Sequence, residues 1–242
     1  MKERMLLMGP PSAGKTYQLI KIYQAVTDMG VGCYVIDLED KFEAAILGNE
    51  LPLPNLFNVT VEWEEYQEAI DKISLPPDSW ILVDRVDLSW PMVQRWFTQK
   101  KYEEELAERM MKKALEMKKP SMFIPRFDQG SWQVINEAYE SIMLKLLYRS
   151  RCNVVMTAGI RGIEDSNPRD ILGHLGIAPR GQKELPHQPH SAFLLDVKKR
   201  GKDLAWYITT AKDLQNRKWF DGEECFDFYI QYVFEYWKGG VG

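Results

Sequence analysis

The sequence predicts an α/β protein built on a mainly parallel sheet with helices on both faces. Short continuous apolar runs alternate with segments in which apolar residues recur at helical spacing. Buried parallel strands joined by crossover helices have this pattern, because both faces of each strand are covered. Nearer the C-terminus, two strand-like segments flank a Lys/Arg/Gly turn, which predicts an antiparallel hairpin at the edge of the sheet.

The first half of the chain supplies four of the expected strands. An apolar run over 5–8 ends at Gly9, and a helical pattern over 15–28 follows it. Gly30 and Gly32 then interrupt the chain. Further strands are expected at 33–37, 56–61 and 80–83, and further helices at 40–47 and 63–73.

A highly charged stretch follows over 91–119. Its charges of both signs, three and four residues apart, predict a solvated helix. We therefore expect a single domain over 1–242 with a charged helical insertion at about 90–130. The remaining expected elements are a helix over 132–149, a strand over 153–158, hairpin strands over 192–197 and 204–209, and an aromatic-rich helix over 226–237.

Composition excludes several classes of protein. The 242 residues are 45% hydrophobic and 27% charged, which is ordinary for a globular chain. Cys33, Cys152 and Cys225 are few and far apart, so neither a disulfide framework nor a zinc ribbon is expected. No apolar run approaches the roughly 18 residues of a membrane span, so we expect no membrane partner. The net charge of -4 disfavours a protein that coats DNA by charge alone.

A phosphate-binding loop is the strongest motif. The pattern G-x-x-x-x-G-K-[ST] lies between the first expected strand and the first expected helix, which is the context that its mechanism demands. In such a loop, backbone N–H groups surround a phosphate, the lysine reaches the β- and γ-phosphates, and the hydroxyl binds Mg²⁺. The alternative is a glycine turn that only caps a helix. The motif consists of Gly9, Pro10, Pro11, Ser12, Ala13, Gly14, Lys15 and Thr16.

Two acids at strand ends are candidates for the rest of the site. Asp84 follows the strand WILV and is expected to hold Mg²⁺, and its alternative role is a turn cap. Glu39 ends the strand segment YVIDLED, and the carboxyl ends of parallel strands line the ligand crevice. It is the candidate general base that orients and deprotonates water. Its alternative role is to cap the next helix, and Asp37 lies two residues earlier.

The segments GPPSAGKT, VIDLE and ILVD together resemble the RecA-like branch of P-loop ATPases. The later segments NVVMTAG and WYITTAKDLQNRKW resemble small phage-encoded ATPases of the AAA/RecA-like type, which are associated with recombination and single-strand annealing. The resemblance implies a RecA-like fold, Mg²⁺-dependent ATP hydrolysis, and a cytoplasmic location, in the host if a phage encodes the chain. It is absent over about 90–130, and Arg85 departs from the small hydroxyl residue common after the strand acid.

The resemblance also implies roles for individual residues. Glu39 matches the glutamate of a D-x-E that serves as the catalytic base, and Thr157 matches a polar sensor of the γ-phosphate. RecA-like ATPases complete the site with a cation from the adjacent subunit, which implies a homo-oligomer with ATP at the subunit interface. Lys212 and Arg217, expected just beyond the last strand, are the leading candidates for that cation. The alternatives are a buried strand threonine and solvated surface cations.

A local basic cluster, KKRGK over 198–202, is expected at the hairpin tip. It would either contact phosphates of single-stranded DNA or form a soluble turn. Nearby aromatic residues could stack on bases, or they belong to the core. They are Trp206, Tyr207, Trp219 and Phe220.

Three functions remain open from the sequence. The first is a RecA-like ATPase that acts on DNA in phage recombination, annealing or repair. The second is a P-loop kinase for a nucleotide or small metabolite, which works alone and closes an arginine-bearing lid. The third is a nucleotide-gated packaging or assembly ATPase whose charged 91–119 segment binds a partner.

Overall fold

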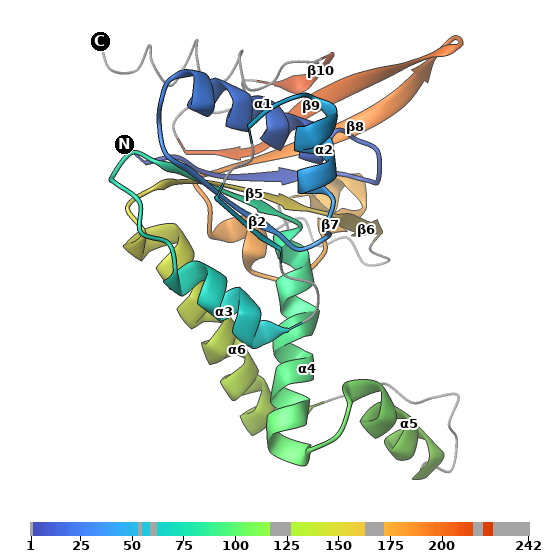
Figure 1. The fold of residues 1–242 in the computed structure, drawn as a ribbon. Coiled ribbons are helices and arrows are strands. Elements are labelled where there is room, and N and C mark those ends of the chain that lie inside the picture. The colour runs from blue at the N-terminus through green and yellow to red at the C-terminus, as the bar shows by residue number, and fades with distance from the viewer. Residues whose placement is uncertain are drawn as a thin grey trace.

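The computed structural model describes residues 2–52, 55–58, 62–116, 127–162, 172–214 and 220–224. These ranges contain an eight-stranded sheet of order β10-β9-β8-β1-β5-β4-β2-β3 (Figure 1). The six strands from β8 to β3 run parallel. At one edge, β9 pairs antiparallel with β8, and β10 pairs antiparallel with β9. The strands are β1 (Arg4–Met8), β2 (Cys33–Asp37), β3 (Asn55–Asn58), β4 (Trp80–Asp84), β5 (Asn153–Ala158), β8 (Ser191–Arg200), β9 (Asp203–Asp213) and β10 (Asp221–Glu224).

Helices cover both faces of this sheet, so the predicted fold class is confirmed (Figure 1). Helices α1 (Lys15–Asp28) and α2 (Phe42–Gly48) cover one face. Helices α3 (Trp63–Asp71), α4 (Ser89–Tyr102) and α6 (Gln129–Leu144) cover the other. Short elements complete the described chain: η1 (Val86–Leu88), α5 (Leu106–Glu116), η3 (Lys145–Arg149), β6 (Ile160–Gly162), η4 (Gly173–Leu175), β7 (Ile177–Pro179) and η5 (Leu185–His187).

Strand β1 explains why the sequence shows continuous apolar runs. Met5 and Leu7 belong to the core under α1, whereas Leu6 and Met8 belong to the core under α3, α4 and α6. All four are fully buried. Successive side chains point to opposite faces, and a strand covered on both faces must be apolar at every position.

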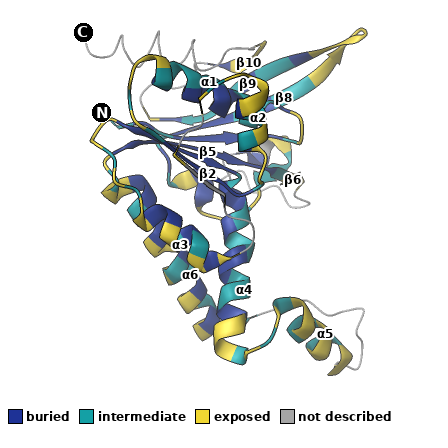
Figure 2. Ribbon diagram, in the orientation of Figure 1, coloured by how far each residue is buried: buried dark blue, intermediate teal, exposed yellow. Residues whose placement is uncertain are grey.

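The prediction of one solvated helix over 91–119 is wrong. Helix α4 ends at Tyr102, Glu103 adopts the left-handed conformation (φ 54°), and α5 begins at Leu106. Helix α4 packs against α3 and α6 and buries Met92 and Phe97 (Figure 2). Only α5 has the expected character, since none of its residues is buried. In the sequence, the many charged residues of the α5 segment made the apolar stripe of α4 difficult to recognise.

Helix α6 and the hairpin strands also differ from their expected bounds. Helix α6 begins at Gln129 because Asp128 caps it: Oδ1 of Asp128 accepts a 2.8 Å hydrogen bond from the Ser131 N–H. The predicted hairpin is confirmed, and both strands are longer than expected.

The predicted terminal helix over 226–237 lies outside the described residues. No helix in the described ranges is long and apolar enough to cross a bilayer.

Candidate functional site

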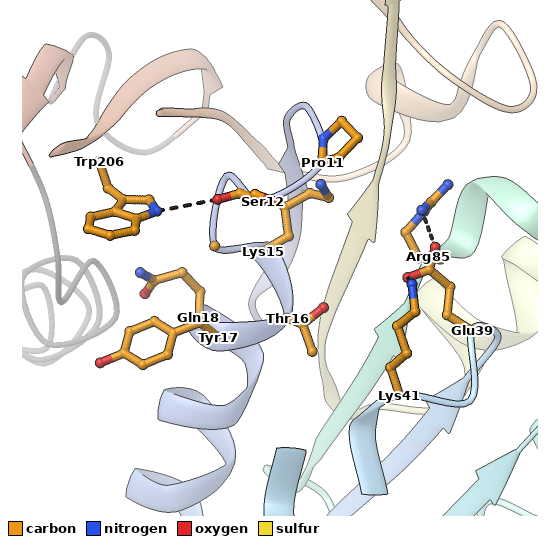
Figure 3. A pocket seen from close by; sticks show the side chains of 11 residues that line it. Pro11, Ser12, Lys15, Thr16, Tyr17, Gln18, Glu39, Lys41, Arg85 and Trp206 are labelled. Atoms are coloured by element: carbon orange, nitrogen blue, oxygen red, sulfur yellow. Dashed lines mark hydrogen bonds and ion pairs between the residues drawn. The ribbon is translucent and has the colours of Figure 1, made fainter. Parts of the chain in front are cut away.

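A cavity of about 670 Å³ lies at the carboxyl edge of the sheet, beside the loop between β1 and α1 (Figure 3). Four separate parts of the chain line it: that loop with the start of α1, the segment after β2, the residue after β4, and strand β9. The lining residues are Pro11, Ser12, Gly14, Lys15, Thr16, Tyr17, Gln18, Glu39, Lys41, Arg85 and Trp206.

The loop of the G-x-x-x-x-G-K-T motif has the backbone shape that a phosphate cradle needs. Ser12 (φ 62°) and Gly14 (φ 86°) both adopt left-handed conformations, which turn successive N–H groups toward one side. Gly14 starts α1 without a side-chain cap. The loop also lies in close contact with β8, because a Cβ on Gly9 would lie 2.4 Å from the carbonyl oxygen of Leu195 in that strand.

The lysine of the motif is folded back onto its own loop. Nζ of Lys15 donates hydrogen bonds to the carbonyl oxygens of Gly9 (3.0 Å) and Pro10 (2.8 Å). Burial lowers the pKa of Lys15, and the nearby positive charge of Arg85 lowers it further. An anion in the cavity would favour the charged form, so this ammonium group is suited to binding a phosphate.

Asp84 lies beside the loop, which is the relationship that the sequence hypothesis requires. Its Oδ2 accepts a hydrogen bond of 2.7 Å from Thr16 Oγ1, and its Oδ1 accepts one of 2.5 Å from Thr157 Oγ1. Asp84 is fully buried, and burial raises the pKa of its carboxyl group. A buried carboxylate and a hydroxyl in contact are hard oxygen donors of the kind that Mg²⁺ binds.

The two acids at the end of β2 differ in their contacts. Asp37 is buried and caps α2, since its carboxylate accepts hydrogen bonds from the N–H groups of Glu39, Lys41 and Phe42. Glu39 lies in the cavity instead. Its Oε2 pairs with Nζ of Lys41 at 3.2 Å, and its Oε1 pairs with Nη1 of Arg85. The helix-capping role considered for Glu39 therefore belongs to Asp37.

Sequence reasoning did not place five of the lining residues in the cavity: Tyr17, Gln18, Lys41, Arg85 and Trp206. Trp206 comes from β9, and its Nε1 donates a 3.4 Å hydrogen bond to the Ser12 carbonyl. The sequence contained one usable signal. Arg85 directly follows the acid expected to hold a metal ion, so its side chain was bound to lie near the same edge of the sheet.

The expected position of Lys212 just beyond the last strand is wrong. It lies within β9, at the end of the antiparallel strand that is paired with the start of β8. This places it at the amino edge of the parallel strands, away from the cavity. Its Nζ bonds the carbonyl oxygens of His187 (2.7 Å) and Pro189 (2.6 Å). The other candidate, Arg217, lies outside the described residues.

The basic cluster does form the hairpin tip. Strand β8 ends with Lys198, Lys199 and Arg200, which directly precede the turn. Arg200 pairs with Glu224 of β10 at 2.8 Å. The aromatic residues near the tip do not share one role, since Phe220 is buried against Phe193 whereas Trp206 lines the cavity. Trp219 lies outside the described residues.

Comparison with known proteins gives a likeness of fold only. No family model matches the chain, and no curated protein matches it. Among solved structures, a KaiC-like protein from the hyperthermophilic archaeon Pyrococcus horikoshii OT3 is similar over 90% of this chain and 82% of its own, with 13% identity and a TM-score of 0.46.

Proposed function

We propose that this protein binds ATP with Mg²⁺ and hydrolyses it in the cavity beside the P-loop. The observation that carries the proposal is the contact between Thr16 and Asp84, which brings the loop and the acid after WILV to one point. Lys15 and Glu39 line the same cavity. A phosphate cradle, a cation for the β- and γ-phosphates, oxygen ligands for a metal ion and a carboxylate base are the parts that phosphoryl transfer to water requires.

Each residue has a distinct task in this proposal. The loop over 9–14 binds the phosphates through backbone N–H groups, and Lys15 exchanges its carbonyl partners for phosphate oxygens. Thr16 and Asp84 hold Mg²⁺, which supplies charge neutralisation at the β- and γ-phosphates when it is bound. Glu39 accepts the proton of the attacking water. Thr157 fixes the orientation of the Asp84 carboxylate through their hydrogen bond and serves as the sensor.

We further propose that the substrate on which the ATPase acts is single-stranded DNA, in recombination, annealing or repair. The support is the exposed basic tip over 198–202 on the same hairpin that carries Trp206 to the P-loop. Phosphate contacts at the tip would be sequence-independent and sensitive to salt. In this proposal the working form is a homo-oligomer, and Arg217 remains a candidate for a cation given to the neighbouring subunit.

The test compares Glu39→Gln with the matched variant Glu43→Gln, which changes the same residue type in α2 outside the cavity. We expect Glu39→Gln to bind ATP with Mg²⁺ as the wild type does and to lose at least about 100-fold in turnover. Glu43→Gln should retain both. Turnover that depends on a small phosphate acceptor, and not on water, would favour the kinase alternative.

DNA action is tested separately. Single-stranded DNA should raise the ATPase rate of the wild type, and replacing Lys198, Lys199 and Lys202 with alanine should remove that stimulation while leaving the basal rate. Mass measurement in solution, with and without ATP, tests the oligomer. A monomer that hydrolyses ATP without any response to DNA would leave the ATPase proposal standing and would refute the DNA and oligomer proposals.

A further inference from the structure

Arg85 places a guanidinium group in the proposed nucleotide cavity, supplied by the same chain. The side chain is held from two sides. Its Nε and Nη2 form a two-pronged ion pair with the carboxylate of Asp87, at 3.0 and 3.1 Å. Its Nη1 pairs with Oε1 of Glu39 (Figure 3). The guanidinium thus has one fixed anchor and one contact with the proposed base.

The anchor is buried and closely packed. Asp87 is only 3% exposed. One glycine leaves room for the anchor, because a Cβ on Gly181 would lie 3.1 Å from Cα of Asp87. A two-pronged pair in such a site fixes the plane of the guanidinium, since its fork matches the carboxylate.

The backbone conformation at position 85 holds this residue beside the Asp84 carboxylate. Arg85 has φ 67°, a left-handed conformation that strains a residue with a Cβ. Glycine would adopt it freely. The conformation turns the Arg85 N–H toward Thr157 Oγ1, to which it donates a hydrogen bond of 2.8 Å, so the position is fixed directly beside the Asp84 carboxylate.

The electrostatics of the cavity favour a triphosphate at this point. Lys15, Lys41 and Arg85 line the cavity together with one carboxylate, that of Glu39. Cations that line one cavity are stabilised when a group with several negative charges lies between them. The γ-phosphate is that group when Lys15 binds it.

We propose that Arg85 is a catalytic cation that pairs with Glu39 in the nucleotide-free protein and transfers this contact to the γ-phosphate when ATP binds. The inference rests on the proposed function. The exchange replaces one ion pair with another and changes no covalent bond, while the anchor on Asp87 stays in place. It frees Glu39 Oε1 to accept a hydrogen bond from water, so the base becomes available only when a triphosphate is present.

In the hydrolytic step, a bond forms between the water oxygen and the γ-phosphorus, and the water proton passes to Glu39. The bond between the γ-phosphorus and the β–γ bridging oxygen breaks, and its electron pair leaves with ADP. Arg85 offsets the charge that develops on the transferring group, an effect worth 10³–10⁵ in rate where an arginine does this in related reactions.

The test uses Arg85→Gly, which removes the side chain at a position whose backbone suits glycine, and Arg85→Lys, which keeps the charge without the fork. Arg151→Gly is the matched control, because Arg151 is an exposed arginine that also has a positive φ (57°) and lies before β5, away from the cavity. The readouts are kcat, KM, and the affinities for ADP and for a non-hydrolysable ATP analogue, each with Mg²⁺.

We expect Arg85→Gly to lose about 1000-fold in kcat and to lose the preference for the ATP analogue over ADP, with ADP affinity unchanged. Free guanidinium ion should restore part of the rate of Arg85→Gly and none of that of Arg85→Lys. Arg151→Gly should behave as the wild type. Turnover in Arg85→Gly equal to or faster than wild type overturns the inference alone. A wild-type protein that binds ATP without hydrolysing it overturns the proposed activity. In that case the contact of Arg85 with the γ-phosphate is still tested by whether Arg85→Gly loses the preference for the ATP analogue over ADP.

Discussion

Thr16 Oγ1 and Asp84 Oδ2 are 2.7 Å apart and hydrogen bonded, although 68 positions separate them in the sequence. Strand β5 lies between β1 and β4, so the start of α1 reaches across one strand to meet the end of β4. The contact also fixes Asp84 from a second side, because Thr157 of β5 bonds its other oxygen. Three segments of the chain thus converge on one buried carboxylate.

Asp84→Asn should abolish the contribution of Mg²⁺ to ATP affinity and reduce turnover at least about 100-fold, because the amide keeps one oxygen acceptor and loses the negative charge. Stability should not fall, since burial raises the pKa of Asp84 and its ionised form therefore costs folding free energy. Calorimetric titration with and without Mg²⁺ measures the first effect and urea unfolding the second. Asp28→Asn, at an exposed position at the end of α1, is the control. An Asp84→Asn protein with undiminished Mg²⁺ dependence would remove the metal assignment.

Trp206 should report nucleotide binding by its fluorescence. Its indole lines the cavity and bonds the Ser12 carbonyl, so a phosphate in the loop changes its surroundings. We expect the change in emission on adding ATP to disappear in Trp206→Phe and to persist in Trp132→Phe, which alters the helical layer. Trp206→Ala should raise the Kd for ATP about tenfold, equal to about 1.4 kcal/mol. An unaltered signal in Trp206→Phe would show that the nucleotide lies elsewhere.

Glu3 should make stability depend on pH. Burial raises its pKa from 4.5 to about 7, so the folded protein holds a proton that the unfolded chain releases. The resulting stabilisation is complete below pH 4.5 and is lost as pH rises through 7, on the order of 3 kcal/mol in total. His190, whose pKa is lowered by burial, acts in the opposite sense. The difference between wild type and Glu3→Gln, from urea unfolding at pH 4.5 to 8, isolates Glu3. Parallel curves for the two proteins would contradict the prediction.

Lys212→Met tests whether this lysine is structural. Its ammonium group satisfies the carbonyl oxygens of His187 and Pro189, so the variant should lower the free energy of unfolding by about 1–2 kcal/mol. Lys199→Met, at the exposed hairpin tip, should change it little. Unfolding curves measure both. A Lys212→Met protein of full stability whose oligomer has lost turnover would instead support the role predicted from the sequence, a cation given to a neighbouring subunit.

Strands β1, β2, β4 and β5 were predictable because burial on both faces makes them mainly apolar. The exposed strand β10 was not predicted. The expected strand over 153–158 matches β5 residue for residue. Helix α4 was not predictable in the same way. In the sequence, the apolar stripe of α4 is followed closely by the charged residues of α5. The break between the two helices lies at Glu103, which adopts a left-handed conformation without being a glycine, so no residue type in the sequence marks the break.

The residues of the proposed site also differ in whether the local sequence predicts them. The P-loop, Asp84 and Glu39 are marked by local sequence, because each follows a strand and lies at its carboxyl end. Trp206 and Lys41 are not, since they reach the cavity through the pairing of β9 with β8 and through the turn that Asp37 caps. Such contacts depend on which distant segments meet, and a single sequence does not contain that information.

The close approach of Gly9 to β8 changes how mutations of this loop must be interpreted. The carbonyl oxygen of Leu195 lies where the methyl group of an alanine at position 9 would have to be. This substitution would therefore push β8 away from the loop even in the absence of a phosphate. A binding defect in that variant would therefore measure damage to the sheet, and it would be mistaken for a lost ligand contact. Position 9 is an architectural residue within a ligand motif, and Lys15 is the position at which the motif can be tested cleanly.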